Sequence, residues 1–187
     1  KLGADETETV SAALEQVVKA GVGDEPRKGA QERLDLISRF KGYLGTWEVA
    51  GPYFQEGKRA GEVFEIAFDP ETSPTGGNWK PLTAGRDDNP WILNLRKVDE
   101  GGDRCVYVRG RVWSEAERPA RLEIGSDDGV KAWLNGKPVH AKFVHRGVNP
   151  GDDKVDVTLQ RGENVLLLKV VQIAGDPQSL LPARVEP

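Results

Sequence analysis

Residues 124–139 read IGSDDGVKAWLNGKPV, and this stretch decides the fold class. Every second residue from Val130 to Leu134 is apolar, which is the period of a β-strand with one buried face. Asn135-Gly136 follows directly, and this pair favours a two-residue hairpin turn because both of its positions take positive φ. The stretch therefore predicts a strand, a tight turn and a second strand.

The same alternation recurs along the chain from about residue 44 onward. It is found in the segments 64–68, 106–112, 121–124 and 155–159, whereas residues 164–171 are apolar on both faces, as in a central strand. No helical pattern lies between these segments. We therefore predict a mainly β fold, an antiparallel jelly-roll β-sandwich over residues 44–187. The Pro- and Gly-rich stretch 69–90 is predicted to be a long loop.

The first part of the chain follows a helical period instead. Val10 and Leu14 recur at helical spacing, and residues 30–40 repeat the pattern. Residues 21–26 contain two glycines and a proline, which is typical of a loop. We predict a helical hairpin over residues 1–43 that packs on the following domain or on a neighbouring one.

Composition excludes several classes of protein. The 187-residue chain has a formal net charge of −4, so nothing favours nucleic-acid binding. No apolar run approaches the roughly 18 residues of a membrane span. Cys105 is the single cysteine, which excludes an intramolecular disulfide framework. The sequence begins at Lys1 and has no methionine, so we expect a mature or trimmed chain without its signal peptide.

Two segments resemble known sugar-binding domains. Residues 124–139, with their Ser-Asp-Asp-Gly and Asn-Gly turns, and residues 155–170, VDVTLQRGENVLLLKV, carry the resemblance. They are similar to the galactose-binding-like jelly rolls found as carbohydrate-binding modules and in glycosidases. They also resemble the lectin-like domain named after anthrax protective antigen. The resemblance covers residues 105–173, and the opening strand WEVAGPYF at 47–54 is a weaker match.

The resemblance implies a function, a location and partners. It implies a non-catalytic carbohydrate-binding module of a larger exported bacterial protein, secreted or periplasmic. The implied partners are a polysaccharide or glycan and the neighbouring domains of a larger chain. Fold alone does not fix the ligand.

The adjacent carboxylates Asp127 and Asp128 are the candidate metal site. In the protective-antigen-type lectins such a pair helps to hold a calcium ion that binds sugar hydroxyls, so the resemblance implies calcium here. Ca²⁺ prefers six to eight oxygen ligands, and Asn149, Asp152 or Asp153 would add to them. The alternative is that the pair caps a tight turn through local backbone amides.

Aromatic side chains are the candidate sugar contacts, because the C–H faces of pyranose rings stack on them while polar groups fix the orientation. The predicted carbohydrate-binding residues are Trp79, Trp91, Trp133 and Asn135. Trp79 is predicted to be an exposed platform on the long loop, and Trp133 is out of phase with the apolar residues of its strand. Trp47 and Trp113 are predicted to be core or sheet-edge residues.

Enzyme motifs are absent from the sequence. No zinc-protease, nucleophile-elbow or nucleotide-binding pattern occurs, and the 30 acidic residues make carboxylate pairs uninformative. We therefore expect a binding module rather than an enzyme. Two alternatives stay open: a structural or protein-interaction sandwich without a sugar ligand, and a small glycosidase-like enzyme.

Overall fold

The structure is a computed structural model of the chain. It describes residues 4–21, 23–40, 44, 46–73, 76–83, 92–98, 101–173, 180–181 and 183–186. The chain divides into two compact units, Lys1–Gly42 and Tyr43–Pro187.

The first unit is a pair of helices, α1 (Ala4–Ala20) and α2 (Asp24–Phe40). Gly21 and Gly23, both with positive φ, stand between them. Asp24 and Glu25 lie in the first turn of α2, where acidic side chains interact favourably with the positive end of the helix dipole. The predicted helical hairpin is confirmed. Across the described ranges, no helix is both long and apolar enough to span a membrane.

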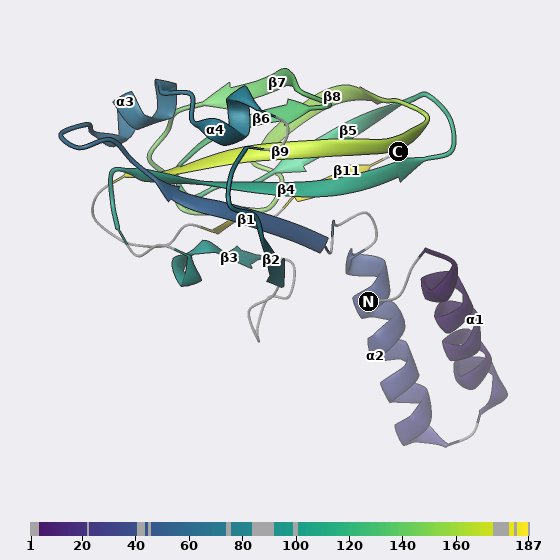
Figure 1. Cartoon of the computed structure of the whole chain (residues 1–187). Coiled ribbons are helices and arrows are strands. Elements are labelled where there is room, and N and C mark those ends of the chain that lie inside the picture. Colours follow the sequence, from purple (N-terminus) through teal and green to yellow (C-terminus); the bar gives the residue numbers. More distant parts are fainter. Residues whose placement is uncertain are drawn as a thin grey trace. The chain divides into compact units, whose positions relative to one another are not determined.

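The second unit is an antiparallel β-sandwich (Figure 1). Its strands are β1 (Thr46–Tyr53), β2 (Lys80–Thr83), β3 (Leu93–Asn94), β4 (Arg104–Ser114), β5 (Arg118–Ile124), β6 (Gly129–Leu134), β7 (Lys137–Lys142), β8 (Asp153–Leu159), β9 (Gly162–Gln172), β10 (Leu180–Leu181) and β11 (Ala183–Glu186). One sheet has the order β2-β1-β4-β9-β6-β7, a second has the order β11-β5-β8, and β10 pairs with β3. The predicted mainly β sandwich is confirmed, with β9 as a central strand.

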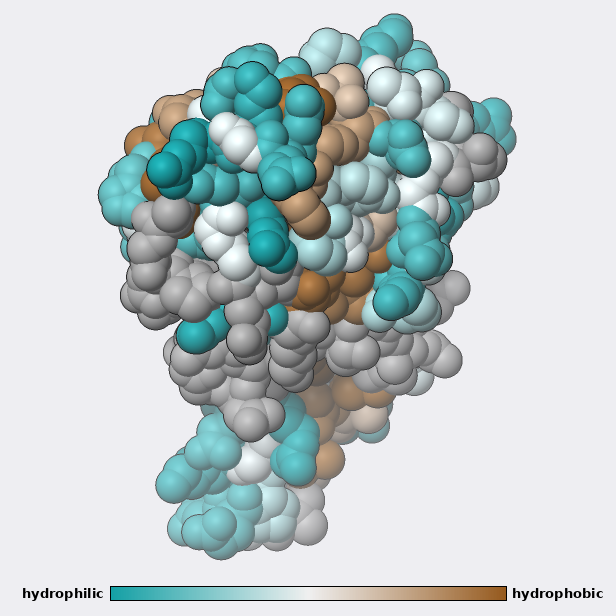
Figure 2. All heavy atoms as spheres, turned by 60° about the vertical axis from the view of Figure 1, so that its left-hand side comes forward, coloured by the Kyte–Doolittle hydropathy of each residue, from teal (hydrophilic) through white to brown (hydrophobic). Residues whose placement is uncertain are grey.

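The core lies between the six-stranded and three-stranded sheets. The six-stranded sheet contributes Val108 and Leu168, and the three-stranded sheet contributes Leu122 and Ile124, all with almost no exposed surface. These residues are the apolar members of the alternating segments, so their burial follows from the period of two. Hydrophilic side chains cover most of the described surface in Figure 2, with smaller hydrophobic patches between them.

The Asn-Gly turn forms as predicted and joins β6 to β7. Asn135 has φ of 52° and Gly136 has φ of 76°, the positive values that this turn requires. The turn fixes the register of the hairpin, and Trp133 consequently projects to the face of β6 opposite the buried Ala132 and Leu134.

Two sequence-based predictions about residues 64–90 are wrong. Segment 64–68 was expected to be a strand, but Phe64 belongs to a short helix, α3 (Ala60–Glu65), whose first amide donates to the Asp103 carboxylate at 2.7 Å. The stretch 69–90 was expected to be a long loop, but its described residues include helix α4 (Asp69–Thr72) and strand β2. Phe64 and Phe68 are four residues apart, a spacing that fits both a strand and one face of a helix. Over so few residues the apolar pattern therefore did not distinguish the two.

Candidate functional site

The outer face of the six-stranded sheet, the face turned away from the three-stranded sheet, carries the candidate site. Trp133 of β6 is paired with Leu167 of β9, Leu167 with Arg109 of β4, and Arg109 with Glu48 of β1. Directly paired residues project to the same side of a sheet. Because the neighbours of these residues along each strand point into the core, all four side chains point outward.

Helices α3 and α4 cover one end of this face, and a buried lysine holds them there. Lys169 has no exposed surface. Its Nζ donates to the carbonyl oxygens of Phe64 at 3.1 Å and Ile66 at 2.5 Å, and to Glu71 Oε1 at 3.0 Å. Tyr107 donates its hydroxyl to the same Glu71 oxygen. Burial raises the pKa of Tyr107 far above its ordinary value of 10.0, so the hydroxyl stays a donor.

Beside α4 the outer face is hollowed, with a cavity volume of about 570 Å³. The hollow is lined by Pro70, Glu71, Thr72, Ser73, Trp79, Arg109, Arg111, Trp133, Asn135, Gly136, Glu163, Val165 and Leu167. Two apolar residues of the lining, Val165 and Leu167, come from strand β9. The hollow thus combines apolar, aromatic and charged side chains from α4 and three strands.

Trp79 lies in this lining and is half-buried rather than fully exposed. Its indole Nε1 donates to the carbonyl oxygen of Gly76 at 2.7 Å, and the guanidinium carbon of Arg109 lies 4.1 Å from the centre of its ring. A guanidinium at this distance from an aromatic face is a cation–π contact. The indole is therefore held in one orientation by its N–H group and by one face of its ring.

Trp133 and Asn135 reach the same hollow from the β6–β7 hairpin. The Asn135 side chain is engaged within the protein, because its Oδ1 accepts from the Val165 amide at 2.8 Å and its Nδ2 donates to Asn164 Oδ1 at 2.9 Å. Asn135 therefore fixes the hairpin beside Trp133. Of the four residues predicted to bind carbohydrate, the structure brings three together, and Trp91 lies outside the described residues.

The two arginines of the hollow pair with Glu163, which lines it, and with Glu48, which lies on β1 outside the lining. Glu48 accepts from Arg109 Nε at 2.7 Å and from Arg111 Nη1 at 2.9 Å, and Arg111 Nε lies 3.5 Å from Glu163. The hydrogen bond from Arg109 is the largest cause that holds the pKa of Glu48 below its ordinary value. Sequence reasoning missed both arginines, although their alternation in 104–114 marked them as outward-facing.

The Asp127–Asp128 turn is tied to distant backbone. Asp128 is almost completely buried, and its two oxygens accept from the amides of Arg146 at 3.1 Å and Ile173 at 2.9 Å. His145 Nδ1 also lies 3.0 Å from Asp128 Oδ1. Asp128 thus joins the turn to the segment after β7 and to the end of β9, rather than to the local amides expected of a turn cap.

Asn149 is exposed and donates to Asp152 Oδ2 at 3.4 Å. Among the residues that the structure describes, no group of three or more His, Cys, Asp or Glu side chains is arranged to hold a metal ion. The Arg146 amide donates to one oxygen of Asp128 and the Ile173 amide donates to the other. Calcium binding at Asp127, Asp128 and Asn149 stays a prediction.

No family model matches this sequence, and no curated protein matches it. Several solved structures show partial structural similarity to this chain. A β-glucuronidase from Faecalibacterium prausnitzii shares 22% identity over 68% of this chain, with a TM-score of 0.44. A family 35 carbohydrate binding module from Clostridium thermocellum shares 18% identity over 46% of this chain and 72% of its own, with a TM-score of 0.34.

The PA14 sugar-binding domain from an RTX adhesin shares 12% identity over 76% of this chain and 88% of its own length, with a TM-score of 0.41. The chain spans 20% of the length of the glucuronidase. All three TM-scores lie below 0.5, and the candidate site is defined by this chain's own residues.

Proposed function

We propose that this chain is a non-catalytic carbohydrate-binding module that holds a neutral glycan in the hollow on its outer face. The observation that carries the proposal is the presence of two tryptophans, Trp79 and Trp133, in one lining with charged and amide side chains. The module would belong to a larger exported bacterial protein, and this part rests on the sequence resemblance of residues 124–139 and 155–170.

The chemistry of the lining suits a sugar. Apolar C–H faces of pyranose rings stack on indole rings, while hydroxyls need hydrogen-bonding groups at the edges. Neighbouring strands lie about 4.8 Å apart, so Arg109, which contacts Trp79, and Trp133 two strands away are separated by about 10 Å. That space suits a sugar ring with Trp133 on one side and the Arg109–Trp79 pair on the other. Because Arg109, Arg111, Glu48 and Glu163 are paired in opposite charges, the lining favours a neutral sugar over an acidic one.

The carboxylates of the hollow favour binding over glycoside cleavage. Glycosidases use two carboxyl groups, one of which donates a proton. Glu71 is held by Lys169 and Tyr107, and Glu163 pairs with Arg111. Both carboxylates are thus engaged by neighbouring side chains of the protein itself, which supports a binding role.

The test is a glycan array followed by calorimetry with the glycan that binds most strongly. Trp133→Ala should lower the affinity about tenfold, equivalent to about 1.4 kcal/mol, because it removes one ring of the site. Because Trp133 is partly buried, the melting temperature of the variant is measured as well, to show that the loss of affinity is not a loss of folding. Phe54→Ala is the control, because Phe54 is an exposed aromatic residue that does not line the hollow.

An unchanged affinity for Trp133→Ala, or an equal loss in Phe54→Ala, would contradict the placement of the sugar. If the wild type binds no glycan on the array, the interaction-module alternative replaces the proposal. Release of reducing sugar by the wild type would instead support the glycosidase-like alternative.

A further inference from the structure

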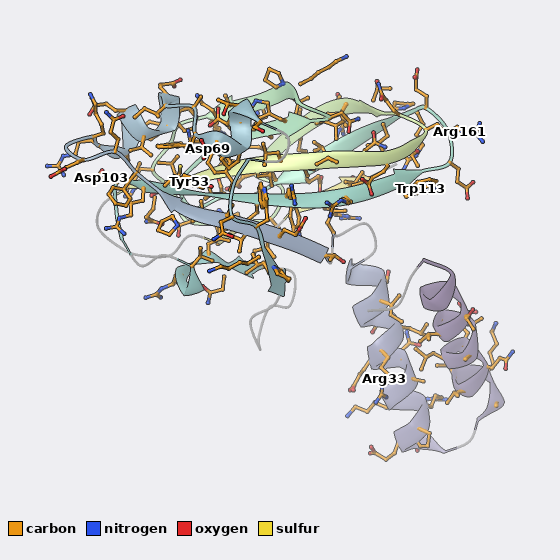
Figure 3. All side chains as sticks on the ribbon, in the orientation of Figure 1. Arg33, Tyr53, Asp69, Asp103, Trp113 and Arg161 are labelled. Atoms are coloured by element: carbon orange, nitrogen blue, oxygen red, sulfur yellow. The ribbon has the colours of Figure 1, made fainter. Side chains whose placement is uncertain are left out.

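Trp113 is the most exposed large hydrophobic side chain among the described residues, with 72% of its surface open to solvent. It was expected in the core or at a sheet edge, and the expectation of a core position is wrong. Trp113 lies near the end of β4, an inner strand of the six-stranded sheet. In Figure 3, Trp113 and Arg161 lie at one end of the sandwich, and Asp103 lies at the other.

Trp113 projects from the outer face that carries the hollow. It pairs with Glu163 of β9, two positions along from the pair Arg111 and Val165 and four from the pair Arg109 and Leu167. Side chains two positions apart on a strand share a face. Trp113 therefore continues the outward row of β4 that begins in the hollow at Arg109.

The distance along this row from Arg109 to Trp113 is longer than a single sugar ring. Strands rise about 3.3 Å per residue, so Trp113 stands about 13 Å along β4 from Arg109, on which Trp79 stacks. A monosaccharide in the hollow cannot also contact Trp113, whereas an extended chain of several sugars can. Arg111 lies between the two positions, and Glu163 lies opposite Trp113 on β9. Both side chains are about half-exposed and offer donors and acceptors to sugar hydroxyls.

We propose that Trp113 is a second sugar-contacting position and that the ligand is an extended oligosaccharide or polysaccharide chain lying along β4 and β9. This deepens the proposed function and rests on it. The chain runs from a sugar held in the hollow, between Trp133 and the Arg109–Trp79 pair, to a sugar stacked on Trp113. The polar side chains of Arg111 and Glu163 contact the sugars between them.

The surroundings of Trp113 favour a sugar over a protein or a membrane. Glu115 and Glu117 follow Trp113 in the sequence, and Glu163 is its partner across the strand pair. All three are exposed. Protein interfaces deplete acidic residues at their cores, and anionic membrane surfaces attract basic rather than acidic segments. A single ring flanked by hydrogen-bonding groups is instead the arrangement that a glycan uses.

The experiment measures affinity against ligand length by calorimetry. The probes are cello-, manno-, xylo- and laminari-oligosaccharides, each from the disaccharide to the hexasaccharide. For the series that binds, the wild-type affinity should rise with length and then level off. Trp113→Ala should lose about tenfold in affinity for the hexasaccharide and stay within twofold of wild type for the disaccharide. Trp113→Phe should recover most of the loss.

Phe54→Ala is the matched control, since Phe54 is 55% exposed and its ring contacts Arg104 rather than the hollow. Melting temperatures of all variants show that they fold. A wild-type affinity independent of length, or an equal effect of Trp113→Ala on short and long ligands, would overturn the inference and leave the proposed function intact. If no series binds the wild type, the proposed function fails, and the inference fails with it.

Discussion

Lys169 shows at the residue scale how a charge can be accommodated inside this sandwich. Its ammonium has three acceptors within 3.1 Å, and its surface is fully buried. The same contacts attach α3 and α4 to the sheet, since two acceptors are the Phe64 and Ile66 carbonyls and the third is Glu71 of α4. The geometry of the hollow therefore depends on a residue that does not line it.

Lys169→Met should be strongly destabilising, because it leaves two carbonyls without their donor and the Glu71 carboxylate without its positive partner. Removing one member of a buried ion pair costs about 3–5 kcal/mol, and urea unfolding measures the loss. Lys154→Met is the control, because Lys154 is largely exposed and pairs with Glu123 at 3.0 Å; exposed pairs contribute at most about 1 kcal/mol. Equal, small losses in the two variants would contradict the role assigned to Lys169.

Single residues also show how far the sequence predicts the site. Trp133 could be placed on the outward face, because its phase against Val130 and Leu134 is a local property. The pairing of Arg109 with Glu48 could not, since it depends on the register between β1 and β4, which are 61 residues apart in sequence at these positions. The sequence also did not distinguish the burial of Trp47 from the exposure of Trp113, because the burial of each depends on contacts with distant parts of the chain.

At the scale of elements, the strands and the Asn-Gly hairpin followed from alternation, whereas the short helices did not. Helix α3 has six residues, too few for the helical period to be distinguished from a period of two. Its start depends on Asp103, 43 residues away, which accepts from the Ala60 amide. Such a tertiary contact has no local signal, so the cover over one end of the outer face was not predictable.

The segment between β7 and β8 is held by a buried carboxylate. Asp153 accepts from Lys142 Nζ at 2.7 Å and from both terminal nitrogens of Arg146. Burial alone would raise the pKa of Asp153, but the hydrogen bonds from Arg146 and Lys142 outweigh it and lower the pKa from 3.8 to about 2. Arg146 also donates to the Ser126 carbonyl oxygen at 3.1 Å, so this carboxylate links the segment to the turn before β6.

This arrangement predicts a pH dependence of stability. A folded-state pKa below the unfolded value of 3.8 means that the contribution of Asp153 is fully present above that value. It is lost as pH falls toward about 2. By linkage the contribution is on the order of 2 kcal/mol. The free energy of unfolding of Asp153→Asn should be lower than that of wild type at neutral pH, and the difference should shrink in acid. A difference that is constant down to the acid limit would contradict the ion-pair account.

At the scale of the whole molecule, the chain combines a helical pair with a sandwich whose two faces differ. One face of the six-stranded sheet packs in the hydrophobic core. The other is covered by α3 and α4 at one end, is hollowed beside α4, and carries an exposed tryptophan farther along β4. The sequence resemblance pointed to sugar binding, and the arrangement of this face supplies the location that the proposal needs.

The most direct test is an NMR titration that follows the indole N–H signals of the five tryptophans. The probe is the neutral hexasaccharide with the highest affinity. The account predicts progressive shifts for Trp79, Trp133 and Trp113, and no shift for Trp47, whose Nε1 donates to the Leu44 carbonyl oxygen beneath the sheet at 2.7 Å. Saturable binding that leaves the Trp79 and Trp133 signals unmoved would contradict the central claim that the hollow is the glycan site.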